Sequence, residues 1–369
     1  MGVERWALNP SNGNTVLIDL IRAEIQKHGP QSFAWFMQQA LYHPEHGYYS
    51  SGRASIGRKG DYFTNVSVGP LFGQLMAAQF AEIWKQLGNI DNFVIVEQGA
   101  HDGQFARDVL DSAQDCSPEF FAALRYRIVE PFPILEDRQR EALRSFGDKV
   151  EWHRLITPFI GIHFSNELLD AMPVRLISSA GEKCVDLDGD KLVFVERPVC
   201  DAGKVNQAAL DWIEDVATKL ERGYVIAIDY GFSRDEFRET VQVRAKHRQL
   251  DSAFEQIGHA DITAHVNWTD IVERAEANGL CLTGFADQHH FLTGIISEWP
   301  DLVQARLLDS TALSSQVLLA GADQKAGRAL RTLLHPEMLG RSFQVLALGK
   351  DVDPSAQLAG FKFARTPNL

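Results

Sequence analysis

The feature that most constrains the fold is an alternation of short apolar runs and helical patterns that begins near residue 70. Apolar runs typical of buried strands occur in FVIVEQ, YRIVE, IGIHF and GYVIAID, and amphipathic stretches separate the first three. Strands that alternate with helices in this way favour a mostly parallel sheet with helices on both faces. The sequence therefore predicts an α/β fold, whose ligands bind at the carboxyl ends of the strands.

Helical patterns and turn signals flank this alternation. One amphipathic helix is predicted to stop at Gly29, and a second helix to begin at Ser32. CVDLDGDKLVFVERP predicts a β-hairpin with Asp188 and Gly189 at its turn. A mainly helical stretch from residue 288 to about 335 precedes SFQVLALGK, which predicts a late strand that rejoins the sheet.

Charge and composition exclude several classes of partner. The 369-residue chain has a net charge of −13 and contains no long run of basic residues. We therefore expect no nucleic-acid partner. No apolar run approaches the roughly 20 residues that span a bilayer. The first residues resemble neither a signal peptide nor an organellar presequence, so we expect a cytoplasmic protein without membrane association. The cysteines and histidines follow no metal-binding spacing, so we expect no metal.

The loop in VEQGAHDGQFARDVL discriminates between two cofactor classes. A dinucleotide fingerprint needs glycines at positions 99, 101 and 104, but two of these hold His101 and Gln104. A methyltransferase loop needs an acid at Glu97 and glycines at 99, 101 and 103, so only His101 departs. This pattern favours S-adenosylmethionine, to which Gly99 and Gly103 would allow close backbone approach. The alternative is that the two glycines only form a tight strand-to-helix turn.

An acidic residue at the end of the next apolar run supports the cofactor interpretation. Glu130 ends YRIVE, 31 residues after Gly99. Its carboxylate could accept hydrogen bonds from two ribose hydroxyls, and charge-assisted bonds of this kind supply both strength and orientation.

Eight segments together resemble one known family. They cover roughly residues 18–350 in family order and read ALYHPEHGYYSSG, GDYFTNVSVGPLFGQ, VEQGAHDG, YRIVEPFPILEDRQREAL, SNELLDAMPV, VIAIDYG, ADITAHVNWTDI and LGRSFQVLALGK. The chain resembles the MidA-like methyltransferases, which include the mitochondrial complex I assembly factor that dimethylates a protein arginine. The resemblance implies a class I methyltransferase fold, Rossmann-like, with a mostly parallel seven-stranded sheet and additional N-terminal and inserted helices that form a lid.

This resemblance suggests a division of the chain. We expect a flexible arm over residues 1–14, then N-terminal helices and a cofactor-covering loop over 15–69. The methyltransferase core would comprise 70–287, with a hairpin insertion near 180–200. The remaining segments would be a helical lid over 288–338, the returning strand over 339–350 and a tail over 351–369.

The polar loop GDYFTNVSVGPLFGQ is a candidate for holding the cofactor. In the resembling family this loop folds over the cofactor, so Asp61, Thr64 and Ser67 are predicted to hold its amino-acid portion. The alternative is that Asp61 and Ser67 only satisfy backbone groups of the loop itself, as such residues often do.

Three residues are candidates for catalysis. NELLDAMPV places Glu167 and Asp170 just beyond a predicted strand, where carboxylates could bind a planar guanidinium. Alternatively, Asp170 caps a turn and Glu167 sits in an ion pair. DITAHVNWTDI places His265 in a predicted strand. An unperturbed histidine titrates near pH 6.5, which suits proton removal, although a lone histidine is more often a packed structural residue.

The departures from the family pattern leave the acceptor open. His101 replaces the middle glycine of the loop, and Asn65-Val66 replaces the usual Ser-Pro. The leading interpretation is a methyltransferase acting on a protein arginine. A small-molecule O- or N-methyltransferase and a non-catalytic assembly factor with the same fold are the alternatives. The oligomeric state is also open, with a homodimer as one option.

Overall fold

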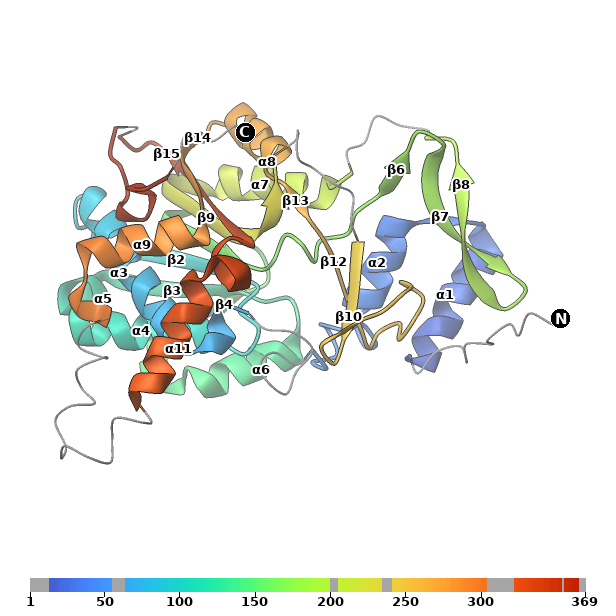
Figure 1. Cartoon of the computed structure of the whole chain (residues 1–369), viewed down its shortest axis with the longest axis horizontal. Helices are drawn as coiled ribbons and strands as arrows, with labels where there is room; N and C mark the ends of the chain where they lie inside the picture. The colour runs from blue at the N-terminus through green and yellow to red at the C-terminus, as the bar shows by residue number, and fades with distance from the viewer. Residues whose placement is uncertain are drawn as a thin grey trace. The chain divides into compact units, whose positions relative to one another are not determined.

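The computed structural model describes residues 13–54, 64–199, 205–233, 241–303, 322–353 and 355–364. Contacts between Cα atoms divide the chain into two compact units, each built from three segments (Figure 1). Unit 1 comprises residues 1–62, 171–207 and 239–264. Unit 2 comprises residues 63–170, 208–238 and 265–369.

Unit 2 contains the sheet that the alternating pattern predicted. Its strand order is β14-β15-β9-β5-β2-β3-β4, and the short β13 pairs with β9. Strands β9, β5, β2, β3 and β4 are parallel, whereas β15 runs antiparallel between β9 and β14, so the predicted late strand does rejoin the sheet. The strands are β2 (Phe93–Gln98), β3 (Leu124–Val129), β4 (Val150–His153), β5 (Phe159–Asn166), β9 (Leu220–Phe232), β13 (Val266–Asn267), β14 (Cys281–Asp287) and β15 (Phe343–Lys350).

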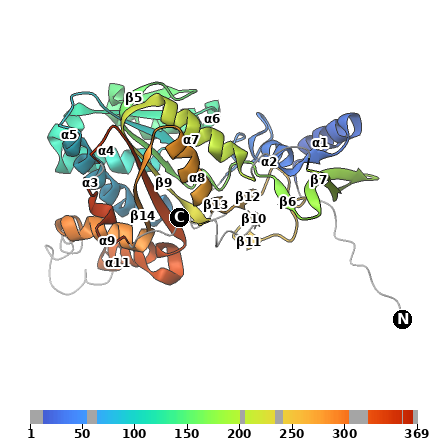
Figure 2. The same cartoon turned by 90° about the horizontal axis from the view of Figure 1, so that it is seen from above.

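Helices cover both faces of this sheet (Figure 2). The described helices of unit 2 are η1 (Val66–Val68), α3 (Leu71–Gln86), α4 (Gln104–Cys116), α5 (Pro118–Ala123), α6 (Pro133–Ala142), η2 (Arg144–Lys149), α7 (Gln207–Lys219), α8 (Trp268–Ala277), α9 (Gln288–Glu298), α11 (Ala322–Leu334), η3 (Pro336–Gly340) and η4 (Ala359–Phe361). Helices α9 and α11 confirm the helical pattern predicted after residue 288 at both ends of that stretch; residues 304–321 lie outside the described chain.

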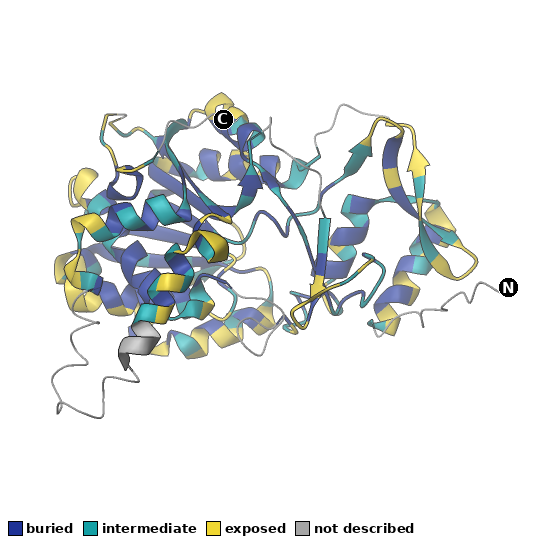
Figure 3. Cartoon of the chain, in the orientation of Figure 1, coloured by how far each residue is buried: buried dark blue, intermediate teal, exposed yellow. Residues whose placement is uncertain are grey.

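Aromatic packing joins α3 and α4 to one face of the sheet. Phe105 of α4 stacks on Phe164 of β5 with ring centroids 4.4 Å apart, and Phe80 of α3 meets Phe164 edge-on at 5.5 Å. On the opposite face, Trp212 of α7 lies edge-on against His163 of β5 at 5.4 Å. The central strands β2, β5 and β9 between these layers are largely buried (Figure 3). This burial explains why they read as continuous apolar runs rather than alternating ones.

Unit 1 begins with the two predicted helices. Helix α1 (Thr15–His28) is capped by Asn14, whose side chain accepts from the Leu17 N–H, and it ends at Gly29. Helix α2 (Phe33–Tyr42) is capped by Ser32. Both helices are confirmed. Two small sheets complete the unit, formed by β1 (Gln31–Ser32), β6 (Leu176–Ser178), β7 (Gly181–Asp188) and β8 (Lys191–Arg197), and by β10 (Val241–Ala245), β11 (Arg248–Gln249) and β12 (Asp261–Ala264).

The predicted hairpin is present, but its turn lies one residue later than expected. Asp188 pairs with Lys191 across β7 and β8, so Gly189 and Asp190 are the loop residues rather than Asp188 and Gly189. A two-residue hairpin loop needs a positive φ at its first position, and Gly189 supplies it with φ of 58°. The strand therefore extends through Asp188.

Candidate active site

Most of the predicted site residues lie at the carboxyl edge of the unit 2 sheet. Glu97 is the second-last residue of β2, Glu130 follows β3, and Glu167 follows β5. Because these three strands are adjacent in the sheet, their ends form one continuous edge. The location agrees with the general position of ligand sites in open α/β sheets.

The glycine loop after β2 has positive φ angles at three positions. Gly99, His101 and Gly103 have φ angles of 81°, 47° and 81°, all in the left-handed region. His101 thus adopts the backbone that a glycine would adopt most readily. An added Cβ at Gly99 would lie 3.4 Å from Leu168, and one at Gly103 would lie 3.3 Å from the Gln139 Cα. At these two glycines the loop backbone therefore packs closely against Leu168 and α6.

The His101 side chain lies beside Asp102 at the tip of this loop. Its Nδ1 is 3.7 Å from the Asp102 carboxylate, and about one fifth of the histidine side chain is exposed. The neighbouring His101 side chain lowers the pKa of Asp102 despite partial burial. The backbone carbonyl of His101 accepts a hydrogen bond of 2.9 Å from the Gln139 amide. The loop is thereby tied to α6.

Glu97 is buried beneath the loop. The Tyr126 hydroxyl donates a 2.8 Å hydrogen bond to its carboxylate. Burial raises the pKa of Glu97 to about 8, although the Tyr126 hydrogen bond opposes the shift. The acid of the loop pattern is thus fixed inside the protein core, on the same face as Phe93 and Ile95.

Two donors orient the Glu130 carboxylate. One oxygen accepts from the Phe132 N–H at 2.9 Å, and the other accepts from the Gln139 side-chain amide at 2.8 Å. The Trp152 indole donates to the Gln139 carbonyl oxygen at 3.0 Å, which sets the orientation of that amide. Burial raises the pKa of Glu130. Sequence reasoning missed Gln139, because no local pattern links a residue in α6 to the end of β3.

Glu167 has a strained backbone at the end of β5. Its φ is 55°, an unusual value for a residue with a side chain, and its N–H donates to the Ile228 carbonyl at 2.9 Å. One carboxylate oxygen accepts from the Asn65 N–H at 3.2 Å and from the Asn166 side-chain amide at 2.9 Å. Backbone strain at such a position is common at functional sites.

A buried carboxylate anchors the loop that carries Asp170. Asp229 of β9 accepts from the Leu169 N–H at 2.7 Å and from the Asp170 N–H at 3.2 Å. Burial raises the pKa of Asp229 to about 7, against the effect of these backbone donors. Asp229 is thus a structural partner of the acidic loop, the segment after β5 that carries Glu167 and Asp170.

The loop before α3 is closed by its own hydroxyl groups. The Thr64 N–H donates to the Ser67 hydroxyl at 2.9 Å, and the Ser67 N–H donates to the Thr64 hydroxyl at 3.1 Å. The Ser67 hydroxyl in turn donates to the Thr64 carbonyl at 2.8 Å. These contacts satisfy loop backbone groups. Asp61 lies outside the described residues.

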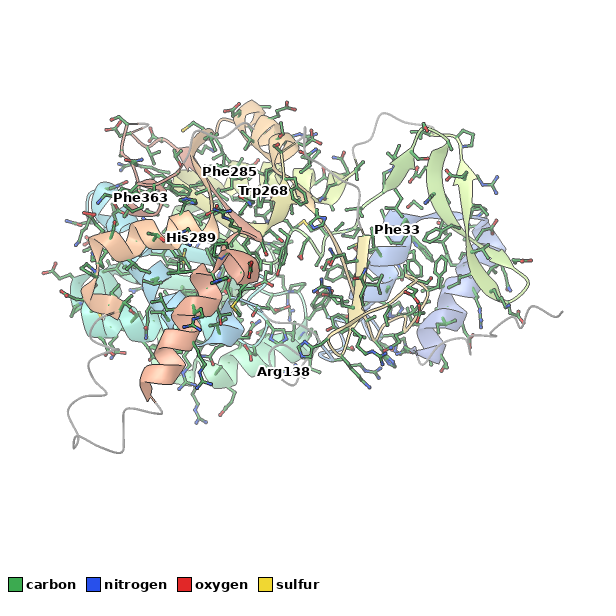
Figure 4. The ribbon with its side chains drawn as sticks, viewed as in Figure 1. Phe33, Arg138, Trp268, Phe285, His289 and Phe363 are labelled. Carbon is green, nitrogen blue, oxygen red and sulfur yellow. The ribbon has the colours of Figure 1, made fainter. Side chains whose placement is uncertain are left out.

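His265 lies between two strands and not within one, which corrects the prediction. The chain leaves β12 of unit 1 at Ala264 and enters β13 of unit 2 at Val266, so His265 is the connecting residue. Its ring centroid lies 4.9 Å from that of Phe232, at the end of β9. Further along, Trp268 and Phe285 pack together with centroids 6.0 Å apart (Figure 4).

Within the described residues, no group of three or more His, Cys, Asp or Glu side chains could hold a metal ion. No helix in the described part of the chain is long and apolar enough to cross a membrane.

Comparisons with known proteins point to one family. The chain matches the model of a family described as "Putative S-adenosyl-L-methionine-dependent methyltransferase" over residues 75–202 and 200–286. Among curated proteins, it is 24% identical to a mitochondrial protein arginine methyltransferase NDUFAF7 homolog of Drosophila melanogaster, over 91% of this chain and 85% of that protein. The mouse protein arginine methyltransferase NDUFAF7, also mitochondrial, is 26% identical over 92% of this chain and 85% of its own length.

Solved structures agree with this match. A Burkholderia thailandensis protein, described as a superfamily member and "likely methyl transferase", was crystallised with S-adenosyl-homocysteine. It has a TM-score of 0.83 and 28% identity, over 95% of each chain. A second crystal structure from the same organism, of an uncharacterized superfamily protein in its native form, has a TM-score of 0.80 and 27% identity over 95% of each chain.

These findings confirm the resemblance and the class I methyltransferase fold predicted from the sequence. The family match covers more than half of the 369 residues and includes the glycine loop, Glu130 and the acidic loop after β5. S-adenosylmethionine is the cofactor of that family. The chain therefore belongs to this family of S-adenosyl-L-methionine-dependent methyltransferases.

Proposed function

We propose that this chain transfers a methyl group from S-adenosylmethionine to an arginine side chain of a protein. The observation that carries the proposal is the acidic loop after β5, in which Glu167 and Asp170 follow the strand next to the glycine loop. Their carboxylates suit a planar guanidinium, which binds carboxylates bidentately. The names of the curated relatives as protein arginine methyltransferases support the same acceptor.

We infer that the glycine loop and Glu130 hold the cofactor. The backbone of Gly99, His101 and Gly103 would contact its methionine and adenosyl groups, with Glu97 buried below. Glu130 would accept from the ribose hydroxyls, since its two oxygens are already oriented by Phe132 and Gln139. Thr64 and Ser67 would shape the covering loop.

The residues of the acidic loop would orient the acceptor nitrogen and neutralise its charge. When bound, the cofactor supplies a methyl group on a positively charged sulfur. As the new nitrogen–carbon bond forms and the sulfur–carbon bond breaks, the acceptor nitrogen loses one proton. Glu167, Asp170 or His265 would take that proton, and S-adenosylhomocysteine would be released. Holding the acceptor in line and away from water would supply most of the rate enhancement.

The test combines a binding and a transfer measurement on Glu167→Gln, with Glu130→Ala as the matched control. Glu167→Gln keeps the size of the side chain and its capacity to accept hydrogen bonds, but removes the charge. We expect it to bind S-adenosylhomocysteine as wild type does by calorimetry, while transfer of radioactive methyl to lysate polypeptides falls at least tenfold. Glu130→Ala should lose cofactor binding itself. Wild-type methylation by Glu167→Gln would contradict the proposed role.

Because His101 replaces a glycine of the family loop, two alternative functions are tested as well. Label that appears only in small metabolites would indicate a small-molecule O- or N-methyltransferase. Absence of binding to both S-adenosylmethionine and its product would indicate a non-catalytic assembly factor. The left-handed backbone of His101 favours retained cofactor binding, because the loop conformation is that of the glycine it replaces. The cytoplasmic location and the homodimer stay predictions, which fractionation and light scattering would test.

A further inference from the structure

A tyrosine lies at the carboxyl edge of the unit 2 sheet, on the strand next to the acidic loop. Tyr230 follows the buried Asp229 near the end of β9, and part of its surface is exposed. In the sheet, β9 lies between β15 and β5, and β5 ends directly before Glu167. The tyrosine is therefore a neighbour of the proposed acceptor site across the strand ends.

The register of β5 and β9 places the Tyr230 ring on the same face of the sheet as the Glu167 carboxylate. Asn166 is paired with Ile228, and residues two apart on a strand share a face, so Tyr230 points to the same side. Glu167 reaches this side, because its carboxylate accepts a 2.9 Å hydrogen bond from the Asn166 amide. Strand spacing and rise put the Cα atoms of Asn166 and Tyr230 about 8 Å apart. A cation bound to Glu167 would thus lie within reach of the ring.

Two contacts fix the orientation of this ring. Phe343 of β15 is paired with Tyr230, and their ring centroids are 4.0 Å apart with 37° between the planes. Since β15 and β5 lie on opposite sides of β9, the other face of the Tyr230 ring is directed toward the end of β5. The Tyr230 N–H donates to one carboxylate oxygen of Asp229 at 2.8 Å. The other oxygen accepts from two N–H groups of the acidic loop, so one carboxylate holds the ring and the loop together.

An aromatic face beside a carboxylate suits one kind of cation. The negative face of a tyrosine ring attracts a cation placed over it, and a planar guanidinium can also stack on the ring. In that position the N–H groups of the guanidinium lie in its own plane, parallel to the ring, and can donate sideways to Glu167. The compact ammonium group of a lysine has no such plane to stack. The pair of groups therefore favours arginine as the acceptor.

We propose that Tyr230 is a specificity-determining residue that stacks on the guanidinium group of the acceptor arginine while Glu167 binds the edge of that group. The inference rests on the proposed function and deepens it. Phe343 supports the ring from the side away from the acceptor, and Asp229 keeps the tyrosine in register with the acidic loop.

The test measures how two small probes inhibit methyl transfer to lysate polypeptides: butylguanidinium and its neutral planar analogue, butylurea. The ratio of the two inhibition constants reports recognition of the positive charge, and wild type should favour butylguanidinium. Tyr230→Leu should reduce this preference about fivefold to thirtyfold, the range of a desolvated contact between a cation and an aromatic ring. Tyr230→Phe is the matched control and should keep the preference, because the face of the ring remains.

Calorimetry with S-adenosylhomocysteine separates acceptor recognition from folding, since each variant should bind this ligand as wild type does. Tyr230→Gln also lacks the ring face and replaces the leucine variant, with the same expectation, if that variant does not fold. An unchanged preference in Tyr230→Leu would overturn the inference and make the ring a packing partner of Phe343. Loss of the preference in Tyr230→Phe would overturn it too, because the hydroxyl would then carry the recognition. If wild type transfers no methyl group to lysate polypeptides, the proposed function fails and this inference with it.

Discussion

At the residue scale, the candidate site combines buried carboxyl groups with backbone conformations that side chains rarely adopt. Burial raises the pKa of Glu97, Glu130 and Asp229, each of which accepts hydrogen bonds from fixed donors. His101 and Glu167 have positive φ angles of 47° and 55°. Both features cost stability, and their concentration at one edge of the sheet is typical of a functional site.

The raised pKa of Glu97 predicts a pH dependence of stability. Its pKa rises from an ordinary 4.5 to about 8 on folding, so the folded state binds the proton more tightly. The resulting stabilisation is complete below pH 4.5 and is lost as the pH rises to 8. Glu97→Gln should therefore gain stability relative to wild type by about 1 kcal/mol per pH unit across that window. Urea titrations of both proteins from pH 5 to 8 measure this difference in the free energy of unfolding. A difference that does not change with pH would contradict the prediction.

His101 predicts that the backbone, rather than the side chain, forms the cofactor cradle. His101→Gly keeps the left-handed conformation at lower strain. We expect S-adenosylhomocysteine affinity within about twofold of wild type, since the loop geometry is unchanged. Calorimetry measures the affinity. A loss of tenfold or more would instead assign the imidazole to ligand binding.

At the element scale, two glycines determine how closely β2, β5 and β9 approach. Gly161 and Gly223 are paired across β5 and β9, with φ angles of 143° and 135°. An added Cβ at Gly161 would lie 2.1 Å from the Val94 carbonyl oxygen, and one at Gly223 would lie 1.9 Å from the Gly161 carbonyl oxygen. Because these contacts are with backbone, no side-chain rotation relieves them.

The same substitution should have opposite effects in strand and helix. Gly223→Ala should destabilise the protein by about 3 kcal/mol or more, because neighbouring strands must separate. Gly327→Ala should stabilise it by about 0.5–1 kcal/mol, because α11 leaves open space at Gly327 and alanine is the better helix former. Denaturant unfolding measures both. Similar changes in the free energy of unfolding at the two positions would show that the close backbone contact at Gly223 does not determine stability.

At the scale of the whole molecule, the glycine loop and the acidic loop both belong to unit 2. Unit 1 collects segments from three parts of the chain, including the hairpin of β7 and β8. Each unit has its own apolar cluster, around Phe105 and Phe164 in unit 2 and around Phe33 and Phe36 in unit 1. A ligand of unit 2 should therefore stabilise mainly that unit.

Hydrogen exchange tests this separation. At 100 times its dissociation constant, S-adenosylhomocysteine should raise the free energy of opening in its binding unit by about 2.7 kcal/mol. We expect slower exchange in peptides covering residues 93–103 and 124–139, with little change in α1. Mass spectrometry of the peptides measures both. Equal protection of α1 would show that the two units open together.

Much of the fold follows from local patterns in the sequence. The buried strands read as apolar runs, the helices α1 and α2 begin at Asn14 and Ser32 and the first ends at Gly29, and β15 was visible as a late strand. These features depend on residues close together in the chain. The acids at strand ends were also visible, because parallel strands place their carboxyl ends at one edge.

Only the tertiary structure decided which side chains meet. Gln139 orients Glu130, Asn65 and Asn166 connect to Glu167, and Asp229 anchors the acidic loop. Asn65 lies 101 residues before Asn166 and 102 before Glu167, so no periodicity or spacing links it to them. The sequence by itself indicated strands and helices through local apolar patterns, and the loop pattern together with the family resemblance indicated the class of cofactor. The contacts that orient the site depend on long-range packing, which brings distant residues within hydrogen-bonding distance.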